Sequence, residues 1–237
     1  MSAIGPRLRG AVFYALFYLL MGLMGLAFFV PAMLSEGAAR WAAKRFFALT
    51  FLLLRLICGV RIVLRGTVPT GPVIVAAKHQ SMLDVFILFH ALPVPRFVMK
   101  RELLRAPVFG WYARRVGVVA IDRAAGPEAR AQMVRELTDP QRAGGQMVIY
   151  PQGTRVPPGQ AAPYRAGIHA VYETTSLPVV LAATNTGCIQ PKGLAVYPGT
   201  AVVEFLPEPV PPGLRRDAFM ARIEAEIEAA SDRLADG

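Results

Sequence analysis

An uncharged stretch of 26 residues, from Gly10 to Ser35, constrains this chain more than any other feature of its sequence. An α-helix needs about 20 apolar residues to cross the hydrocarbon core of a bilayer, so the stretch is long enough to do so. The competing interpretation is a cleavable signal peptide, because Arg7 and Arg9 give the stretch a basic start. Signal peptides usually contain only about 7–15 apolar residues, and Pro31–Leu34 is a poor cleavage site. We therefore expect the stretch to remain in the mature protein as a membrane segment.

A second apolar stretch, Phe46–Val60, follows a short basic connector. The cations of this connector are Arg40, Lys44 and Arg45. They would have to be translocated if both stretches spanned the bilayer, which the positive-inside tendency opposes, so we favour a helical hairpin that dips into the cytoplasmic leaflet. Gly22 and Gly25 would allow close helix approach, and Arg55 could reach lipid headgroups. The alternative is a single membrane anchor, with the second stretch packed on a globular domain.

Length and composition indicate one folded domain with an appendage. The chain has 237 residues, 54% of them hydrophobic and 18% charged, which excludes a disordered chain. One core commonly serves about 100–200 residues. We expect a membrane-associated helical hairpin over residues 1–59 and an α/β domain over residues 60–237. Cys58 and Cys188 lie far apart and beside no histidine, so neither a disulfide framework nor a zinc site is indicated.

The positive charge is concentrated in the first half of the chain. Residues 1–125 hold 16 Lys and Arg against 4 Asp and Glu, whereas residues 126–237 hold 10 against 12. Such a basic surface attracts nucleic acid, anionic lipid headgroups or phosphorylated substrates. The hydropathy of the N-terminal stretches favours the lipid interpretation, and no nucleic-acid-binding motif accompanies the cations.

Beyond residue 60, short apolar runs alternate with helical patterns, which predicts an α/β fold. Runs such as VIVAA (73–77) and GVVAI (117–121) are almost continuously apolar, as expected of strands covered on both faces. We predict strands at Arg61–Leu64, Val73–Ala77, Phe97–Met99, Val116–Ile121, Gln146–Tyr150, Val179–Ala183 and Ala201–Phe205. We predict helices at Met82–Leu92, Pro107–Arg115, Pro127–Leu137, Ala166–Thr174 and Leu214–Leu234. The expected architecture is a mostly parallel or mixed sheet flanked by helices, with the hydrophobic helical hairpin at the N-terminus.

The last predicted helix has an apolar side and an acidic side. Its apolar stripe, which recurs at steps of three and four and should face the core, consists of Phe219, Ile223, Ile227, Ala230 and Leu234. Its acids, which we expect to be solvated rather than catalytic, are Glu224, Glu226 and Glu228.

His79 and Asp84, which follow the strand Val73–Ala77, form the first candidate for chemistry. Within one helix a five-residue step would place them about 140° apart, so His79 should precede the helix. With Ser81 as the N-cap and Asp84 in the first turn, the carboxylate can reach the imidazole Nδ1. This leaves Nε2 free to take a proton from a hydroxyl. Alone, the H-x4-D pattern is weak, and a structural histidine beside a capping aspartate is the alternative.

Two further clusters follow predicted strands. Gln152, Gly153, Thr154 and Arg155 lie in the segment YPQGTR, which ends the strand Gln146–Tyr150 with a turn. Lys100 and Arg101 follow the strand Phe97–Met99. The carboxyl edge of an α/β sheet commonly binds ligands, and arginine suits bidentate contact with phosphate. A histidine flanked by such groups suggests base-assisted acyl transfer to a phosphorylated acceptor. Ser81 is a conceivable nucleophile, but no G-x-S-x-G segment surrounds it.

Taken together, the ordered blocks resemble the glycerolipid acyltransferases. His79–Asp84 looks like their H-x4-D motif, and VMKRELLRAPVFGWYARRVGVVAIDR (98–123) is similar to their second block. YPQGTR looks like the third block, usually F/Y-P-E-G-T-R, and Leu177–Val180 looks like the fourth, which contains proline. The blocks cover roughly residues 60–185, and the closest resemblance is to the bacterial 1-acyl-sn-glycerol-3-phosphate acyltransferases.

The resemblance implies that acyl-CoA or acyl-carrier protein donates an acyl group to the sn-2 hydroxyl of lysophosphatidic acid. His79 would be the general base and Asp84 would orient it. Arg155, with Lys100 or Arg101, would hold the acceptor phosphate beside the Gln152–Thr154 turn. Membrane lipids are the expected surroundings, at the cytoplasmic face of a bacterial inner membrane. We expect no cofactor, no metal and no nucleic-acid partner.

Gln152 departs from the pattern, because the family commonly has glutamate there. Glutamine keeps hydrogen bonding but lacks the negative charge, so a proton-transfer role at this position is disfavoured and a role in shaping the loop is not. The departure also leaves room for another acceptor, such as a lyso-ornithine lipid. The rival from another class is a non-catalytic membrane protein that binds anionic lipids.

Overall fold

A seven-stranded sheet forms the centre of the computed structural model, which describes residues 4–122, 126–139 and 144–237. Its strand order is β1-β7-β6-β2-β5-β3-β4. The strands are β1 (Val60–Arg65), β2 (Val73–Ala77), β3 (Pro95–Lys100), β4 (Val119–Ile121), β5 (Gln146–Ile149), β6 (Val179–Thr184) and β7 (Gly199–Phe205). Neighbouring strands pair in parallel, except that β6 and β7 are antiparallel. The predicted mostly parallel or mixed sheet is confirmed, and each predicted strand is present with ends shifted by a few residues.

The largest such shift is at β4, which begins at Val119 instead of the predicted Val116. Helix α5 (Phe109–Arg115) runs directly up to Val116, and Gly117 then turns the chain with a φ of +80°. Glycine tolerates this left-handed conformation, which interrupts extended pairing. The start of the apolar run is therefore a turn. Arg123, the last residue of the second sequence block, lies outside the described residues.

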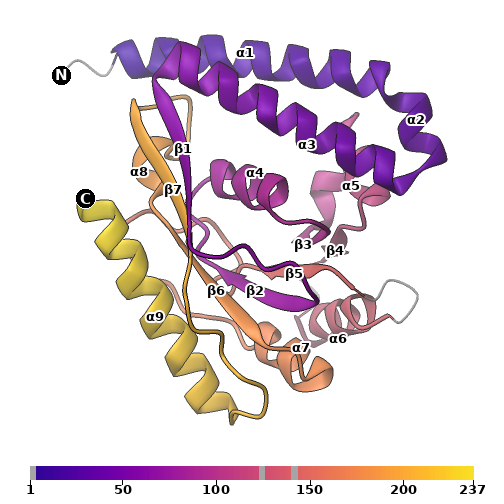
Figure 1. Cartoon of the computed structure of the whole chain (residues 1–237), viewed down its shortest axis with the longest axis vertical. Helices are drawn as coiled ribbons and strands as arrows, with labels where there is room; N and C mark the ends of the chain where they lie inside the picture. The colour runs from indigo at the N-terminus through magenta and orange to yellow at the C-terminus, as the bar shows by residue number, and fades with distance from the viewer. Residues whose placement is uncertain (1–3, 123–125, 140–143) are drawn as a thin grey trace.

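Helices cover both faces of the sheet (Figure 1). In β2, Val75 and Ala77 pack in a cluster with α1, α3 and α4, whereas Ile74 and Ala76 pack with α6, α7 and α9. This alternation is the two-residue period of a strand buried on both sides. The helices of this part are α4 (Met82–Ala91), α5, α6 (Gly126–Leu137), α7 (Gly167–Thr175), the short α8 (Thr186–Ile189) and α9 (Arg216–Asp236). The five predicted helices are present, and α8 was not predicted.

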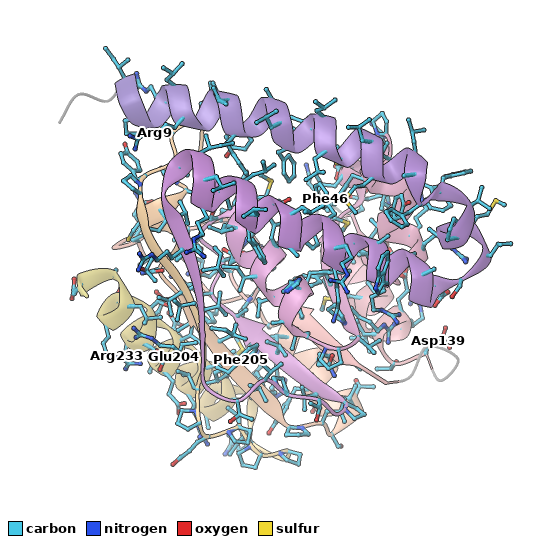
Figure 2. The ribbon with its side chains drawn as sticks, turned by 45° about the horizontal axis from the view of Figure 1, so that its top comes forward. Arg9, Phe46, Asp139, Glu204, Phe205 and Arg233 are labelled. Atoms are coloured by element: carbon cyan, nitrogen blue, oxygen red, sulfur yellow. The ribbon has the colours of Figure 1, made fainter. Side chains whose placement is uncertain are left out.

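The apolar stripe of α9 faces the core as predicted, because all five of its residues are buried. On the same helix, Arg233 donates to Glu204 of β7 over 3.0 Å. Figure 2 shows these two labelled side chains next to each other, where α9 crosses the strand. The C-terminal helix is thus fixed to the sheet by both apolar packing and an ion pair.

The N-terminal segment folds as the predicted helical hairpin. It consists of α1 (Ile4–Ala27), the short α2 (Phe29–Leu34), α3 (Glu36–Leu53) and a π-helical turn, Leu54–Cys58. Figure 1 shows α1 and α3 side by side along one side of the molecule, joined at one end by α2. Phe46 of α3 lies between the two helices in Figure 2, with its ring centroid 5.2 Å from that of Phe17. Phe17 in turn stacks on Phe86 of α4 at 5.5 Å, so the hairpin packs directly on the α/β part.

The basic residues expected between the two helices lie inside α3, so that prediction was wrong. The chain turns at Ser35, whose extended backbone ends α2 and whose Oγ accepts a hydrogen bond from the Ala38 amide at 3.3 Å. This N-cap starts α3 well before the second apolar stretch. Lys44 donates to the carbonyl of Leu92 at 2.6 Å, and Arg45 lies over the Trp41 ring at 5.3 Å. Lys44 and Arg45 therefore contact the protein from a helix rather than from a loop.

The two glycines expected to bring the hairpin helices together have other surroundings. A Cβ on Gly25 would lie 2.3 Å from a methyl of Val108, so this glycine admits the segment before α5 and not α3. A Cβ on Gly22 would meet nothing within 4 Å. Aromatic rings, not glycines, fill the contact between α1 and α3.

The outward side of α1 is strongly apolar. Among the described residues, α1 is the single helix that is both long enough and apolar enough to cross a membrane. Its exposed large apolar side chains are Ile4, Leu8, Val12, Leu16, Tyr18, Leu19, Leu23 and Leu26. Its inward side is packed, because Phe13 and Phe17 are buried.

Gly10 determines how closely the start of α1 approaches the rest of the protein. A Cβ at this position would lie 1.7 Å from the backbone oxygen of Leu194. Nearby, the Val196 amide donates to the carbonyl of Pro6 at 3.2 Å. Two backbones therefore meet here without a side chain between them, which requires glycine.

We predict that Gly10→Ala destabilises the protein by about 1–3 kcal/mol, because the added methyl forces the two backbones apart. Gly22→Ala is the matched control in the same helix, and it should be neutral or stabilising by up to about 1 kcal/mol because alanine favours a helix. Urea unfolding of both variants in detergent micelles measures the difference. Equal stabilities for the two variants would contradict the packing described for α1.

Candidate active site

Three polar clusters meet at one edge of the sheet. β2, β5 and β3 are neighbours and run parallel, so their carboxyl ends share an edge. His79 follows β2, the turn Tyr150–Arg155 follows β5, and Lys100 ends β3. The predicted gathering of these three segments at one edge is therefore present in the fold.

His79 and Asp84 are hydrogen-bonded to each other. Their Nδ1 and Oδ1 atoms lie 2.9 Å apart, and the His79 side chain is 16% exposed. Because Asp84 engages Nδ1, Nε2 is the nitrogen left to face a substrate. The arrangement has the geometry predicted from the spacing, with His79 before α4 and Asp84 in its first turn.

Asp84 is fully buried and has further hydrogen bonds at its second oxygen. Oδ2 accepts from the amides of Gln80 at 2.9 Å and Ser81 at 2.8 Å, and from the hydroxyl of Thr186 at 3.3 Å. Ser81 caps the same helix, with its Oγ 3.2 Å from the amide of Leu83. One carboxylate thus both caps the start of α4 and orients the imidazole.

The turn after β5 holds His79 from the other side. The Tyr150 ring stacks on the imidazole with centroids 4.1 Å apart, and the Val156 amide donates to the carbonyl of His79 at 2.8 Å. The Tyr150 hydroxyl is buried close to the Asp84 carboxylate. Burial, together with the nearby charge of Asp84, raises the pKa of Tyr150 well above its ordinary value. Tyr150 therefore acts as a neutral aromatic wall for the imidazole.

The four residues of the Gln152–Arg155 turn have different surroundings. Gln152 is buried, whereas Thr154 and Arg155 are exposed. Gly153 has a φ of +69°, and its amide donates to the Tyr150 carbonyl at 2.9 Å, which closes the turn. Thr154 and Arg155 thus project from a tight turn beside His79, where they are free to meet a ligand.

The two cations after β3 separate. Lys100 is exposed and pairs with Glu102 at 3.3 Å. Arg101 donates to Gln132 of α6 at 3.2 Å and lines a polar pocket together with Arg105 and Arg114. Lys100 therefore remains near the common edge, while Arg101 is directed toward α6.

Glu228, expected to be solvated, belongs to the polar surroundings of this edge, so that prediction was wrong. It pairs with the buried Lys78, which directly precedes His79, and accepts from the Tyr164 hydroxyl at 2.8 Å. The periodicity of α9 could show only that Glu228 lies off the apolar stripe. The one available signal was Lys78 itself, because a lysine ending the buried run VIVAA needs a carboxylate.

A second polar chain links the site to the N-terminal hairpin. Ser81 Oγ donates to Gln190 at 2.8 Å, and the amide nitrogen of Gln190 donates to the Tyr14 hydroxyl at 3.1 Å. Tyr14 belongs to α1. The helix cap next to His79 is thus connected by hydrogen bonds to the first helix of the chain.

An apolar cavity of about 130 Å³ lies between the hairpin and the α/β part. Its lining comes from α1, α3, α4, β3 and α5 and includes Phe17, Met21, Ala43, Phe86, Phe97 and Tyr112. Phe97 also neighbours Tyr150, with ring centroids 6.2 Å apart, and Tyr150 stacks on His79. The cavity therefore adjoins the imidazole through two aromatic rings.

No group of three or more His, Cys, Asp or Glu side chains suited to a metal ion occurs within the ranges 4–122, 126–139 and 144–237. The polar groups of the edge are one imidazole, the buried Asp84 carboxylate, the Lys78–Glu228 ion pair and exposed cations. Such an arrangement suits proton transfer from a hydroxyl beside an anionic group.

Comparisons with known proteins agree with this chemistry. A family model described as Acyltransferase matches residues 60–184. A 1-acyl-sn-glycerol-3-phosphate acyltransferase of Pseudomonas aeruginosa is 31% identical over 94% of this chain and 95% of its own length. A lyso-ornithine lipid O-acyltransferase of Rhodobacter capsulatus is 34% identical over 53% of this chain and 44% of its own. The crystal structure of a Thermotoga maritima LPA acyltransferase shares the fold, with a TM-score of 0.81 at 22% identity over 99% of this chain and 98% of that one.

We predict that Asp84→Ala destabilises the protein by about 2 kcal/mol or more, because two buried amides lose their acceptor and α4 loses its capping box. Asp232→Ala, an exposed aspartate of α9, is the control and should change stability by less than about 0.5 kcal/mol. Chemical unfolding followed by circular dichroism measures both. A stable Asp84→Ala variant would show that the carboxylate does not organise the start of α4.

Proposed function

The chain belongs to the Acyltransferase family, and from this premise we propose that it transfers an acyl group from acyl-CoA or acyl-carrier protein to the sn-2 hydroxyl of lysophosphatidic acid, forming phosphatidic acid. The observation that carries the proposal is the His79–Asp84 pair at a sheet edge that also presents Arg155 and adjoins an apolar cavity. The name of the P. aeruginosa relative supports the acceptor.

In the proposed reaction His79 is the general base. Its Nε2 takes the proton of the acceptor hydroxyl as the oxygen attacks the thioester carbon, and the tetrahedral intermediate collapses with release of the thiolate. The imidazolium then returns the proton to the thiolate sulfur, so no net proton is gained. Asp84 holds the imidazole with Nε2 toward the hydroxyl and stabilises the imidazolium. The thioester is already activated, so alignment and proton transfer are the main tasks of the protein.

The acceptor phosphate is assigned to the turn after β5. Arg155 is exposed and offers two parallel N–H donors, the geometry that phosphate oxygens prefer. Lys100 at the end of β3 would add a second cation by leaving Glu102, and Arg101 would have to leave Gln132 to take part. Gly153 and Thr154 form the tight turn, and the buried side chain of Gln152 anchors it to the protein interior.

The apolar cavity is assigned to a fatty acyl chain. Its walls are almost entirely hydrocarbon and aromatic side chains, and it lies next to the base through Phe97 and Tyr150. Each methylene buried in such a place contributes about 0.8 kcal/mol. A lipid substrate therefore gains affinity there that a water-soluble alcohol lacks.

Residues 1–59 are assigned as a membrane-associated hairpin and residues 60–237 as the catalytic domain. Gly10 near one end of α1 approaches Leu194, and Gly25 near the other end approaches Val108. These 15 positions span about 22 Å of helix, so α1 lies along the domain instead of leading away from it across a bilayer. Its exposed leucines then dip into one leaflet, with Arg55 near the headgroups. The positive-inside tendency puts this surface on the cytoplasmic face of a bacterial inner membrane.

A lyso-ornithine lipid is the second candidate acceptor. The R. capsulatus relative favours it, and so does Gln152, which departs from the usual third block. A panel of lysolipid acceptors with radiolabelled acyl-CoA or acyl-carrier protein separates these reactions. The absence of transfer to every acceptor would favour the non-catalytic lipid-binding interpretation.

We predict that His79→Ala lowers acyl transfer by about 10²–10⁴-fold, the usual contribution of a general base, while the unfolding midpoint stays near that of the parent protein. His90→Ala, an exposed histidine of α4, is the control and should keep its activity. The assay follows labelled phosphatidic acid formed from lysophosphatidic acid. Turnover near the parent rate in His79→Ala would remove the assignment of the base.

We predict that Arg155→Ala raises the KM for lysophosphatidic acid by about tenfold to a hundredfold, because the charged contact with the phosphate is lost. The KM for an acceptor without a phosphate should change much less. Arg216→Ala, an exposed arginine at the start of α9, serves as the control. If Arg155→Ala raises the KM for both acceptors equally, the arginine does not recognise the phosphate.

A further inference from the structure

A buried cation lies directly beside the base. The Lys78 side chain is 2% exposed, and its ammonium donates to Glu228 Oε2. Burying a charge is costly unless it is paired, and removing one partner of a buried pair leaves the other uncompensated. The negative charge of Glu228 therefore stabilises the end of the strand that is followed by His79.

The Glu228 carboxylate joins three segments that are distant in the sequence. Its Oε2 accepts from Lys78 at the end of β2, while Oε1 accepts from the Tyr164 hydroxyl at 2.8 Å and from the Gln152 amide at 3.3 Å. Burial and the bond to Glu228 raise the pKa of Tyr164, so its hydroxyl remains a donor. Glu228 itself comes from α9. A single carboxylate thus connects the end of β2, the turn after β5 and the C-terminal helix.

Gln152 fits this carboxylate because it is an amide. It is 3% exposed, and its Nε2 faces Glu228 while its Oε1 is buried without a hydrogen-bond partner among the described residues. A glutamate of the same shape would direct an oxygen at Glu228 Oε1, so two carboxylates would face each other with no donor between them. The glutamine in YPQGTR and the glutamate in α9 are therefore complementary.

We propose that Glu228 is a positioning residue for acyl transfer, which holds the Lys78–His79 strand end against the Gln152–Arg155 turn. It supplies from α9 the negative charge that the third block commonly has at position 152. The inference rests on the proposed function for its activity readout, but its stability readout is independent of any substrate. On the opposite side the Val156 amide already holds the His79 carbonyl, so Glu228 completes the attachment of the two segments.

The test is a charge exchange between positions 152 and 228. Glu228→Gln removes the charge, Gln152→Glu adds a second one, and the double variant Q152E/E228Q moves it from α9 to the turn. Each single variant should lower kcat by at least about tenfold, since a displacement of about 1 Å near the reacting atoms can cost a hundredfold. The double variant should return to within about threefold of the parent kcat, because the cluster around Lys78 again holds one carboxylate. Glu224→Gln, exposed one turn earlier on α9, is the control and should match the parent protein.

A pH profile distinguishes this role from a merely structural one. In Q152E two neighbouring carboxylates raise the folded-state pKa of one of them, so that carboxyl group is protonated at low pH. The stability and activity of Q152E relative to the parent protein should therefore be highest at low pH. Both should fall as the pH rises above about 4.3, the ordinary pKa of glutamate. Dividing by the parent rate at each pH removes any pH dependence that the two proteins share, and the double variant should show no such fall.

The outcomes are separable. Rescue of kcat and of the urea midpoint in the double variant supports the proposal. If E228Q alone does not fold, restoration of folding by the added Q152E substitution supports it equally. Additive losses in the double variant, a double variant that does not fold, or single variants equal to E224Q would overturn it. If the parent protein transfers no acyl group to any acceptor, the proposed function fails, while the urea midpoints of the four variants still decide whether the charges are exchangeable.

Discussion

The parallel pairing of β2 with β5, and of β5 with β3, is the constraint on which the site depends. It brings three carboxyl ends, separated by tens of residues in the sequence, to one edge of the sheet. Antiparallel pairing would have placed His79 and Arg155 at opposite ends. The single antiparallel pair among the described strands, β6 with β7, lies on the other side of β2 and leaves this edge intact.

The N-terminal hairpin takes the place of an ordinary covering layer on one face of the sheet. It contributes buried aromatic rings toward α4 and exposed leucines away from it. Several of the rings that pack the hairpin on the domain, among them Phe17 and Phe86, also line the apolar cavity between the two parts. The hairpin helices therefore combine an exposed apolar side with the walls of an apolar cavity.

Most of the fold could be predicted because continuous apolar runs such as VIVAA have few alternatives to a strand buried on both faces. The turn from α2 into α3 could not, because the N-cap Ser35 lies at the end of the uncharged stretch and the cations that follow resemble a loop. Gly25 shows a related limit: a glycine indicates that something approaches closely, but not which segment it is. The position of Arg101, which contacts α6 and lines a polar pocket, could not be predicted from the sequence either, because it depends on how α5 and α6 lie beside β3.

The sequence by itself determined the α/β layers and the pairing of His79 with Asp84, because strand periodicity and a five-residue step across a helix start depend on neighbours along the chain. The tertiary structure alone decided that Glu228, 150 positions after Lys78, neutralises that buried cation, and that Phe17 and Phe97 share a cavity. The physical reason is range. Hydrogen bonds and periodicity within one turn or strand depend on residues that are neighbours in the sequence. A buried charge must instead be compensated by a group that can be distant in the sequence and that only the packing of whole elements brings near.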